Sequence, residues 1–156
     1  MIFFIQTWEE GSHVKLSTTT RYGLRALSDL CAQGGEGPVA VSDIARRQDI
    51  PANYLEQLFA RLRRGDILRS VRGAQGGYLL ARPAGEITVA EIVDALGESI
   101  TFGDCQTEAG CDQIDICPTF SLWRKVRDSI DEILKATTLE DLVRNRTLFQ
   151  DEGEEL

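Results

Sequence analysis

The sequence predicts a mainly α-helical fold with a small β wing, a winged helix-turn-helix followed by a long dimerisation helix. Three observations predict it. Two amphipathic helical segments are separated by a tight turn at residues 49–51, and the second segment has an amide- and arginine-rich outer face. A glycine-rich hairpin follows directly. A later helix over residues 119–136 carries apolar residues near coiled-coil spacing.

Length and composition are those of one compact domain with a modest extension: 156 residues, 42% of them apolar and 27% charged. No run of about 18 apolar residues occurs, which excludes a membrane span. The net charge of -8 is unevenly distributed. Residues 15–82 hold 11 Lys and Arg against 6 Asp and Glu, whereas residues 83–156 hold 6 against 17. A basic first half joined to an acidic second half predicts that one end meets phosphate.

Residues 1–14 are predicted to be an extension outside the fold. The codons for Glu9-Glu10-Gly11 can spell a purine-rich ribosome-binding sequence, and Val14 follows at a plausible distance for an alternative start codon. We therefore expect translation to begin at Val14, which would remove the only histidine, His13. A genuine amino-terminal arm is the alternative, and peptide mapping of the native protein distinguishes the two.

A winged helix-turn-helix domain is predicted over residues 15–97. Its first three helices cover residues 18–33, 41–49 and 52–64. The first begins at a Thr18 or Thr19 cap, the second at a Ser42 cap, and the third ends at Gly65. The third helix has apolar residues at the spacing i, i+3, i+4, i+7, which predicts an inward stripe of Leu55, Leu58, Phe59 and Leu62.

The hairpin is formed by β-prone runs at residues 67–72 and 78–82, and a further helix is expected at 85–97 behind a Thr88 cap. The remaining segments are a cysteine-rich loop at 98–118, two helices within 119–145 and an acidic tail at 146–156. The two helices cover residues 119–136 and 139–144, the shorter one capped by Thr138. The last part of the tail, DEGEEL at residues 151–156, is expected to be disordered.

The third helix and the hairpin carry the side chains expected to meet DNA. Asn53, Glu56 and Gln57 are on the exposed side of the first turns, and such side chains can read base edges in a major groove. A dense group of arginines follows, which predicts phosphate neutralisation. The predicted contacts are Asn53, Tyr54, Glu56, Gln57, Arg61, Arg64, Arg69, Arg72, Gln75 and Gly76. The alternative is a merely solvated arginine-rich face, which the adjoining wing disfavours.

Three cysteines, Cys105, Cys111 and Cys117, follow the pattern C-x5-C-x5-C. This is not the C-x2-C spacing of a zinc knuckle, and three thiols would leave one unpaired in a disulfide framework. Three thiolates on one loop can face a single soft centre, and iron–sulfur clusters are held by such sets. Structural or incidental cysteines remain the alternative to a cluster site.

Four segments together resemble the Rrf-two family of bacterial winged-helix transcription factors, and within it the iron–sulfur regulators. They are KLSTTTRYGLRAL, NYLEQLFARLRR, SVRGAQGGYLLAR and C-x5-C-x5-CPTFSLW, and the resemblance runs from about Lys15 to Asn145. It implies a homodimer on a palindromic operator, with the three cysteines ligating a cluster that tunes DNA affinity. It implies major-groove contacts by Asn53, Glu56 and Gln57 and a minor-groove contact by Arg72. The dimer interface that it implies on the long helix is Trp123, Val126, Ile130 and Ile133.

The chain departs from that family at the fourth ligand. The histidine expected three residues after the last cysteine is Phe120, and the aspartate used in a nitric-oxide-sensing branch is Arg21. The fourth position is therefore open to solvent, to a small thiol, to nothing, or to one of the nearby carboxylates Asp104, Glu108, Asp112 and Asp115. Overall similarity favours a 2Fe-2S cluster, and the missing histidine keeps 4Fe-4S open.

The predicted function is that of a cytoplasmic repressor that senses cluster status, oxygen or nitric oxide. A cluster-free regulator whose cysteines form a disulfide on oxidation is the alternative. An iron–sulfur carrier or enzyme is disfavoured, because the chain has no dependable histidine, phosphate-binding loop or acid–base pair. We expect the cysteine loop to pack between the wing domain and the partner's long helix, so that a cluster changes the spacing of the two recognition helices.

Overall fold

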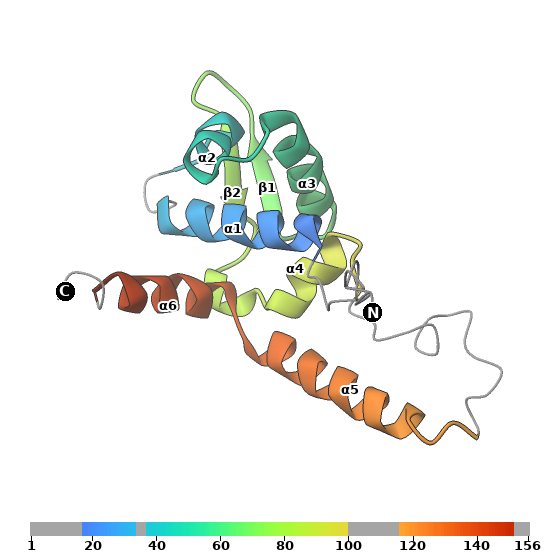
Figure 1. The fold of residues 1–156 in the computed structure, drawn as a ribbon. Helices are drawn as coiled ribbons and strands as arrows, with labels where there is room; N and C mark the ends of the chain where they lie inside the picture. The colour runs from blue at the N-terminus through green and yellow to red at the C-terminus, as the bar shows by residue number, and fades with distance from the viewer. Residues whose placement is uncertain (1–16, 34–36, 100–115, 152–156) are drawn as a thin grey trace, which may run out of the picture.

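In the computed structural model the described residues are 17–33, 37–99 and 116–151, and they confirm the predicted fold class (Figure 1). The six α-helices described are α1 (Thr18–Gln33), α2 (Val41–Gln48), α3 (Ala52–Arg64), α4 (Val89–Ala95), α5 (Phe120–Ala136) and α6 (Leu139–Asp151). The hairpin consists of β1 (Leu68–Val71) and β2 (Gly77–Leu80), and a single 3-10 turn, η1 (Ala84–Glu86), follows it. The described part contains no helix long and apolar enough to cross a membrane.

The core lies where α1, α2, α3 and α4 meet the base of the hairpin. The predicted inward stripe of α3 is confirmed, since Leu55, Leu58, Phe59 and Leu62 are all buried. The ring of Phe59 packs edge-on against Tyr78 of β2, with centroids 5.1 Å apart. An edge-on aromatic pair adds to the stabilisation from area burial alone. The hydrophobic face of the recognition helix therefore anchors both the helix and the wing.

The hairpin is antiparallel and runs in register from Leu68 opposite Leu80 to Val71 opposite Gly77. An additional bridge joins Val39 to Tyr78, and their backbone hydrogen bonds measure 3.0 and 2.9 Å. A Cβ atom on Gly77 would lie only 2.3 Å from the Val39 carbonyl oxygen. A glycine is thus required where the chain before α2 approaches the wing.

The first two helices begin at Thr18 and Val41 as predicted, but the cap residues predicted for them are wrong. Ser17, and neither Thr18 nor Thr19, caps α1, because its hydroxyl accepts a hydrogen bond from the Thr20 amide at 3.0 Å. No side chain caps α2, so Ser42 does not have the predicted role. Adjacent hydroxyl residues have similar capping preferences, which leaves the sequence unable to choose among them.

Helix lengths in the second half also differ from the prediction. The helix expected over residues 85–97 is divided into η1 and α4, with the Thr88 cap between them as predicted. The last helix extends to Asp151 and does not end at residue 144. Thr138 lies at its start as predicted, and its hydroxyl accepts from the Asp141 amide at 3.2 Å.

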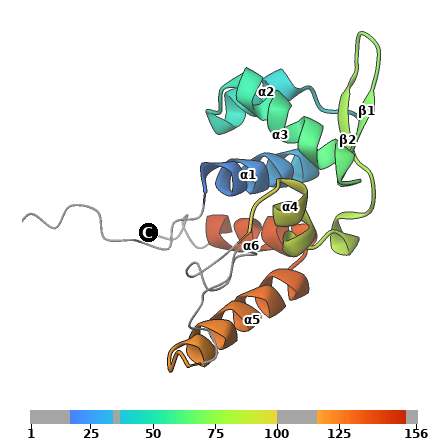
Figure 2. The same ribbon diagram turned by 90° about the vertical axis from the view of Figure 1, so that its right-hand side faces the viewer.

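The starts of α4 and α6 are joined by a short β-bridge between Thr88 and Thr138. The Val89 amide donates to the Thr137 carbonyl at 2.9 Å, and the Leu139 amide donates to the Ile87 carbonyl at 2.8 Å. Leu139 is fully buried, and α6 packs against α1. Helix α5 projects away from the rest of the molecule in both views, so this bridge is the point at which its carboxyl end is attached (Figures 1 and 2).

The capping interactions of Glu91 and Asp141 at this bridge should make the protein less stable in acid. Hydrogen bonds from the Thr88 amide and Arg82 hold the pKa of Glu91 below its usual range, and the Thr138 amide and hydroxyl do the same for Asp141. Because the folded-state pKa values are lowered, the stabilisation is present above the unfolded values near ~4 and is lost as the pH falls through the folded values.

We therefore expect the urea midpoint to decrease as the pH falls below about 4. The Glu91→Gln/Asp141→Asn double variant should lose part of that pH dependence. Equal pH dependence in the two proteins would show that the caps do not contribute to it.

Candidate DNA-binding interface and cysteine site

The start of α3 is set by the turn that follows α2. Asp49 ends α2 in the left-handed conformation, with φ at 52°. The next residue, Ile50, is buried, and its amide donates to the Ala45 carbonyl at 3.0 Å. Pro51 then precedes the first turn of α3, where its missing N–H costs no hydrogen bond. This is the compact turn of a helix-turn-helix, and it fixes the direction of α3 relative to α2.

The predicted base-reading side chains lie together on the outer side of α3. Asn53, Glu56 and Gln57 are exposed, as is Arg64 three turns further along. They lie opposite the buried stripe, as expected for an amphipathic helix. Helix α3 and the tip of the hairpin both lie above α1 in Figure 2, on the side away from α5. The outer side of α3 therefore presents amide, carboxylate and guanidinium groups along its length.

Two of the predicted contacts on α3 are engaged within the protein. Tyr54 is half-buried, its hydroxyl shares a hydrogen bond of 3.0 Å with the Thr19 hydroxyl, and its ring packs edge-on against Tyr22. Arg61 is also half-buried, and its Nη1 donates to the Leu96 carbonyl at 2.9 Å. Tyr54 thus fastens the first turn of α3 to α1, and Arg61 fastens its last turns to α4.

The wing carries the other predicted contacts. Arg69, Arg72 and Gln75 are exposed, and Gly76 is half-buried. The Gly76 amide donates to the Gly73 carbonyl at 3.0 Å, and a Cβ atom on Gly76 would lie 2.4 Å from the carbonyl oxygen of Val71. The tight tip therefore requires glycine for its own backbone packing, and it holds Arg72 at the end of β1.

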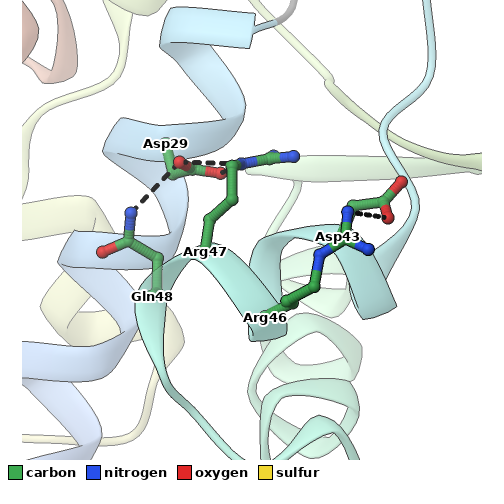
Figure 3. A network of polar contacts seen from close by, with 5 residues as sticks. All are labelled: Asp29, Asp43, Arg46, Arg47 and Gln48. Carbon is green, nitrogen blue, oxygen red and sulfur yellow. Dashed lines mark hydrogen bonds and ion pairs between the residues drawn. The ribbon is translucent and has the colours of Figure 1, made fainter.

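An ion pair that sequence inspection missed fixes α2 on α1 (Figure 3). The Arg47 guanidinium donates to Asp29, with its closest contact at 2.7 Å, and Gln48 Nε2 donates to the same carboxylate at 3.1 Å. The Asp29 side chain is only 5% exposed. Buried carboxylates are rare without such partners. Helical periodicity gives no signal for this pair, because Asp29 and Arg47 lie 18 residues apart on different helices.

Of the three cysteines in the predicted cluster site, Cys117 is described, and Cys105 and Cys111 lie outside the described residues. Cys117 precedes α5, and its sulfur lies 3.3 Å from the Thr119 hydroxyl. Hydrogen bonds from that hydroxyl and from the Thr119 and Phe120 amides lower the pKa of the Cys117 thiol. A thiolate is the form that binds a metal, so this residue fits a ligand role.

The neighbouring side chain of Phe120 supplies no ligand atom. Its ring is half-buried, and the guanidinium carbon of Arg124 lies 6.0 Å from the ring centroid. The remaining cysteine, Cys31, lines an open pocket of about 300 Å³ between α1 and the hairpin, and burial raises the pKa of its thiol. Among the described cysteines, only Cys117 therefore combines an accessible sulfur with a favoured thiolate.

Helix α5 has no buried residue among its described side chains. Trp123 is 39% exposed and Ile133 is 63% exposed, while Val126 and Ile130 are half-buried. Leu122 adds a further exposed apolar side chain. An exposed apolar stripe on a projecting helix is typical of an interaction surface.

Comparison with known proteins agrees with this architecture. The HTH-type transcriptional regulator IscR of Xenorhabdus nematophila is 44% identical over 136 residues, which cover 87% of this chain and 83% of that protein. The solved structure of T. potens IscR has a TM-score of 0.70 and 42% identity, covering 85% of this chain and 88% of that one. The structure of CymR (YrzC), the global cysteine regulator of B. subtilis, has a TM-score of 0.72 and 34% identity, covering 85% and 98%.

The family model for Rrf2, an iron-dependent transcriptional regulator, matches residues 16–145, which are most of the chain. The match includes α1 to α5, the wing and the three-cysteine segment. With its helix-turn-helix, its wing and these relatives, the chain belongs to the Rrf2 (Rrf-two) family of transcriptional regulators.

Proposed function

We propose that this regulator is a homodimeric repressor that senses its iron–sulfur status in the cytoplasm through Cys105, Cys111 and Cys117. The observation that carries the proposal is the Cys117 thiol, half-buried just before α5 and hydrogen-bonded in a way that favours its thiolate. It is the last member of the C-x5-C-x5-C pattern, in a family described as iron-dependent. When bound, a cluster would supply a redox- and oxygen-responsive centre.

The DNA-binding end supports recognition of both grooves. Asn53, Glu56 and Gln57 have the hydrogen-bonding groups that read base edges in the major groove. Arg72 at the end of β1 is proposed to enter the minor groove. Gln75 and Gly76 are proposed to bring the wing tip close to the DNA backbone. Arg64 and Arg69 are proposed to contact phosphates. Tyr54 supports these contacts by holding α3 on α1.

A measurement of DNA affinity in two states tests the proposal. The DNA is one palindromic duplex selected with wild-type protein from a randomised library. The dissociation constant is measured by fluorescence anisotropy for cluster-loaded and cluster-free protein without oxygen. We expect the two constants to differ. Equal constants would contradict cluster sensing and leave DNA recognition intact.

Replacing Arg72 by alanine is expected to weaken binding to the selected duplex by about 1–3 kcal/mol and to leave iron content unchanged. The slope of log affinity against log salt should also become shallower. Arg144→Ala is a matched control, because it removes the same charge from α6, where Arg144 pairs with Glu140. Similar weakening by both variants would indicate a general charge effect and contradict the proposed wing contact.

Dimerisation is proposed to occur through the apolar stripe of α5, formed by Trp123, Val126, Ile130 and Ile133. Ile133→Asp should convert the dimer to a monomer in light scattering, because it would bury a charge in the interface. The exposed position of Ile133 means that the monomer's own core is untouched. Ser121→Asp, on the opposite side of α5 by helical spacing, should leave the dimer intact. A dimer that survives Ile133→Asp would contradict this interface.

The second candidate function is a cluster-free regulator that responds to thiol oxidation. The structural similarity to CymR, the global cysteine regulator of B. subtilis, supports this candidate. It predicts that mild thiol oxidation of iron-free protein changes DNA affinity and that reductant reverses the change. Iron-free protein whose affinity is independent of thiol redox state would contradict it.

A further inference from the structure

We infer that Arg61 is a coupling residue: it transmits changes in the cysteine segment to the recognition helix α3 by holding the carboxyl end of α4. The inference rests on the proposed function, since it concerns how cluster binding changes DNA affinity. It assigns Arg61 a positioning role, whereas Arg64 and Arg69 remain proposed phosphate contacts and Arg72 a proposed minor-groove contact.

Helix α4 ends in a hydrogen-bonded cap. The Gly97 amide donates to the Asp94 carbonyl at 2.8 Å, and the Glu98 amide donates to the Val93 carbonyl at 3.1 Å. Gly97 has a φ of 73°, in the left-handed region. These features define a Schellman motif, which satisfies two of the last carbonyls of a helix. The Leu96 carbonyl receives Nη1 of Arg61 at 2.9 Å, so a residue of α3 completes the end of α4.

The hydrogen bond between Arg61 and the Leu96 carbonyl is surrounded by close packing. A Cβ atom on Gly65, at the end of α3, would lie 2.6 Å from the Cβ of Ala95 on α4. Gly65 has a φ of -87°, so its role as a glycine is this close approach and not a left-handed cap. The Leu96 side chain is fully buried, and a Cβ atom on Gly23 of α1 would lie 2.6 Å from its Cδ1. The end of α4 therefore has little freedom to move without moving α3 or α1.

The cysteine segment lies between α4 and α5 in the chain. It begins after Gly97 at the end of α4, and its last cysteine, Cys117, lies three residues before α5. Helix α4 contacts α1, α3 and α5, and it lies between α3 and α5 in both views (Figures 1 and 2). Because the segment joins α4 to α5 along the chain, a group bound by its cysteines would act first on these two helices. Within the described residues, the hydrogen bond from Arg61 to the Leu96 carbonyl joins the end of α4 to α3.

A matched control lies on the same helix. Arg64 is exposed one turn beyond Arg61, whereas Arg61 is half-buried and bonded to α4. The two residues have the same charge and are both in the last turns of α3. Replacing each by methionine removes the same guanidinium group and keeps an apolar stem of similar length. Differences between the two variants therefore report on the connection to α4 and not on net charge.

The experiment measures the dissociation constant of the wild-type-selected duplex for cluster-loaded and cluster-free protein, at several salt concentrations. Iron and sulfide content are determined in parallel. In wild-type protein the ratio of the two constants is expected to lie within the range of about 5- to 150-fold that is typical of coupled sites. In Arg61→Met the ratio should fall toward one, with iron content and salt slope unchanged. In Arg64→Met both constants should rise together, the ratio should persist, and the salt slope should decrease by about one.

Arg61→Lys is measured beside these variants and remains informative if Arg61→Met does not fold. Lysine keeps the charge that a phosphate contact needs but lacks the planar fork of the guanidinium. A reduced ratio in Arg61→Lys supports coupling. A wild-type ratio in either folded Arg61 variant overturns the inference, as does an Arg61→Met effect that matches Arg64→Met. A wild-type ratio of one would contradict cluster sensing itself, which is a separate failure.

Discussion

Replacing Cys117 by alanine is expected to remove iron and sulfide from protein purified without oxygen, while the chain remains folded. Cys117 is half-buried and is not part of the buried core, so its removal leaves no cavity in that core. Three thiolates are the proposed ligands, and Phe120, which stands where the resemblance implies a histidine, has no ligand atom. Loss of one of only three ligands should therefore be decisive. Iron and sulfide analysis measures the loss, and circular dichroism checks the fold.

Two further variants complete this test. Cys111→Ala is expected to behave as Cys117→Ala does, because both belong to the same proposed ligand set. Cys31→Ala is the control: it removes a thiol that lines the pocket between α1 and the hairpin, and cluster content should stay at the wild-type level. Full iron and sulfide in either Cys111→Ala or Cys117→Ala would contradict the ligand assignment.

Replacing Asp29 by alanine is expected to lower the free energy of unfolding by about 2–3 kcal/mol. The Asp29 carboxylate is almost fully buried and accepts hydrogen bonds from Arg47 and Gln48 of α2. Its removal leaves the Arg47 guanidinium without its partner. Because the Arg47 side chain is 33% exposed, water can reach it, which keeps the loss below that of a fully buried pair.

Urea unfolding measures this effect, and Asp43→Ala is the matched control. Asp43 pairs with Arg46 on the exposed side of α2, so its removal should cost only about 0–1 kcal/mol (Figure 3). Loss of the Asp29 pair should also weaken DNA binding, because α2 sets the start of α3. Equal unfolding free energies for the two variants would contradict a structural role for the buried pair.

The fold was largely predictable because its signals are local. Apolar residues at helical spacing identified α3 and its buried side, and the glycine-rich tip identified the wing. The contacts that sequence inspection missed join distant residues: Asp29 with Arg47, and Val39 with Tyr78. No periodic pattern encodes such pairs, since each depends on how complete helices and strands are packed together.

The DNA-binding end was predictable in part for a related reason. Periodicity separates the exposed and buried sides of a helix, and it placed Asn53, Glu56 and Gln57 correctly on the exposed side. It does not resolve side chains at the boundary. Tyr54 and Arg61 lie there and are engaged with α1 and α4, which only the packed structure reveals.

Native mass spectrometry of protein purified without oxygen from iron-replete cells tests the central proposal most directly. We expect a dimer whose mass exceeds that of the two chains by a whole number of clusters. The size of the increment distinguishes 2Fe-2S from 4Fe-4S and reveals any small-molecule fourth ligand. A dimer with no added mass would contradict cluster sensing and leave DNA recognition by α3 and the wing intact. It would favour direct redox sensing by the cysteine thiols.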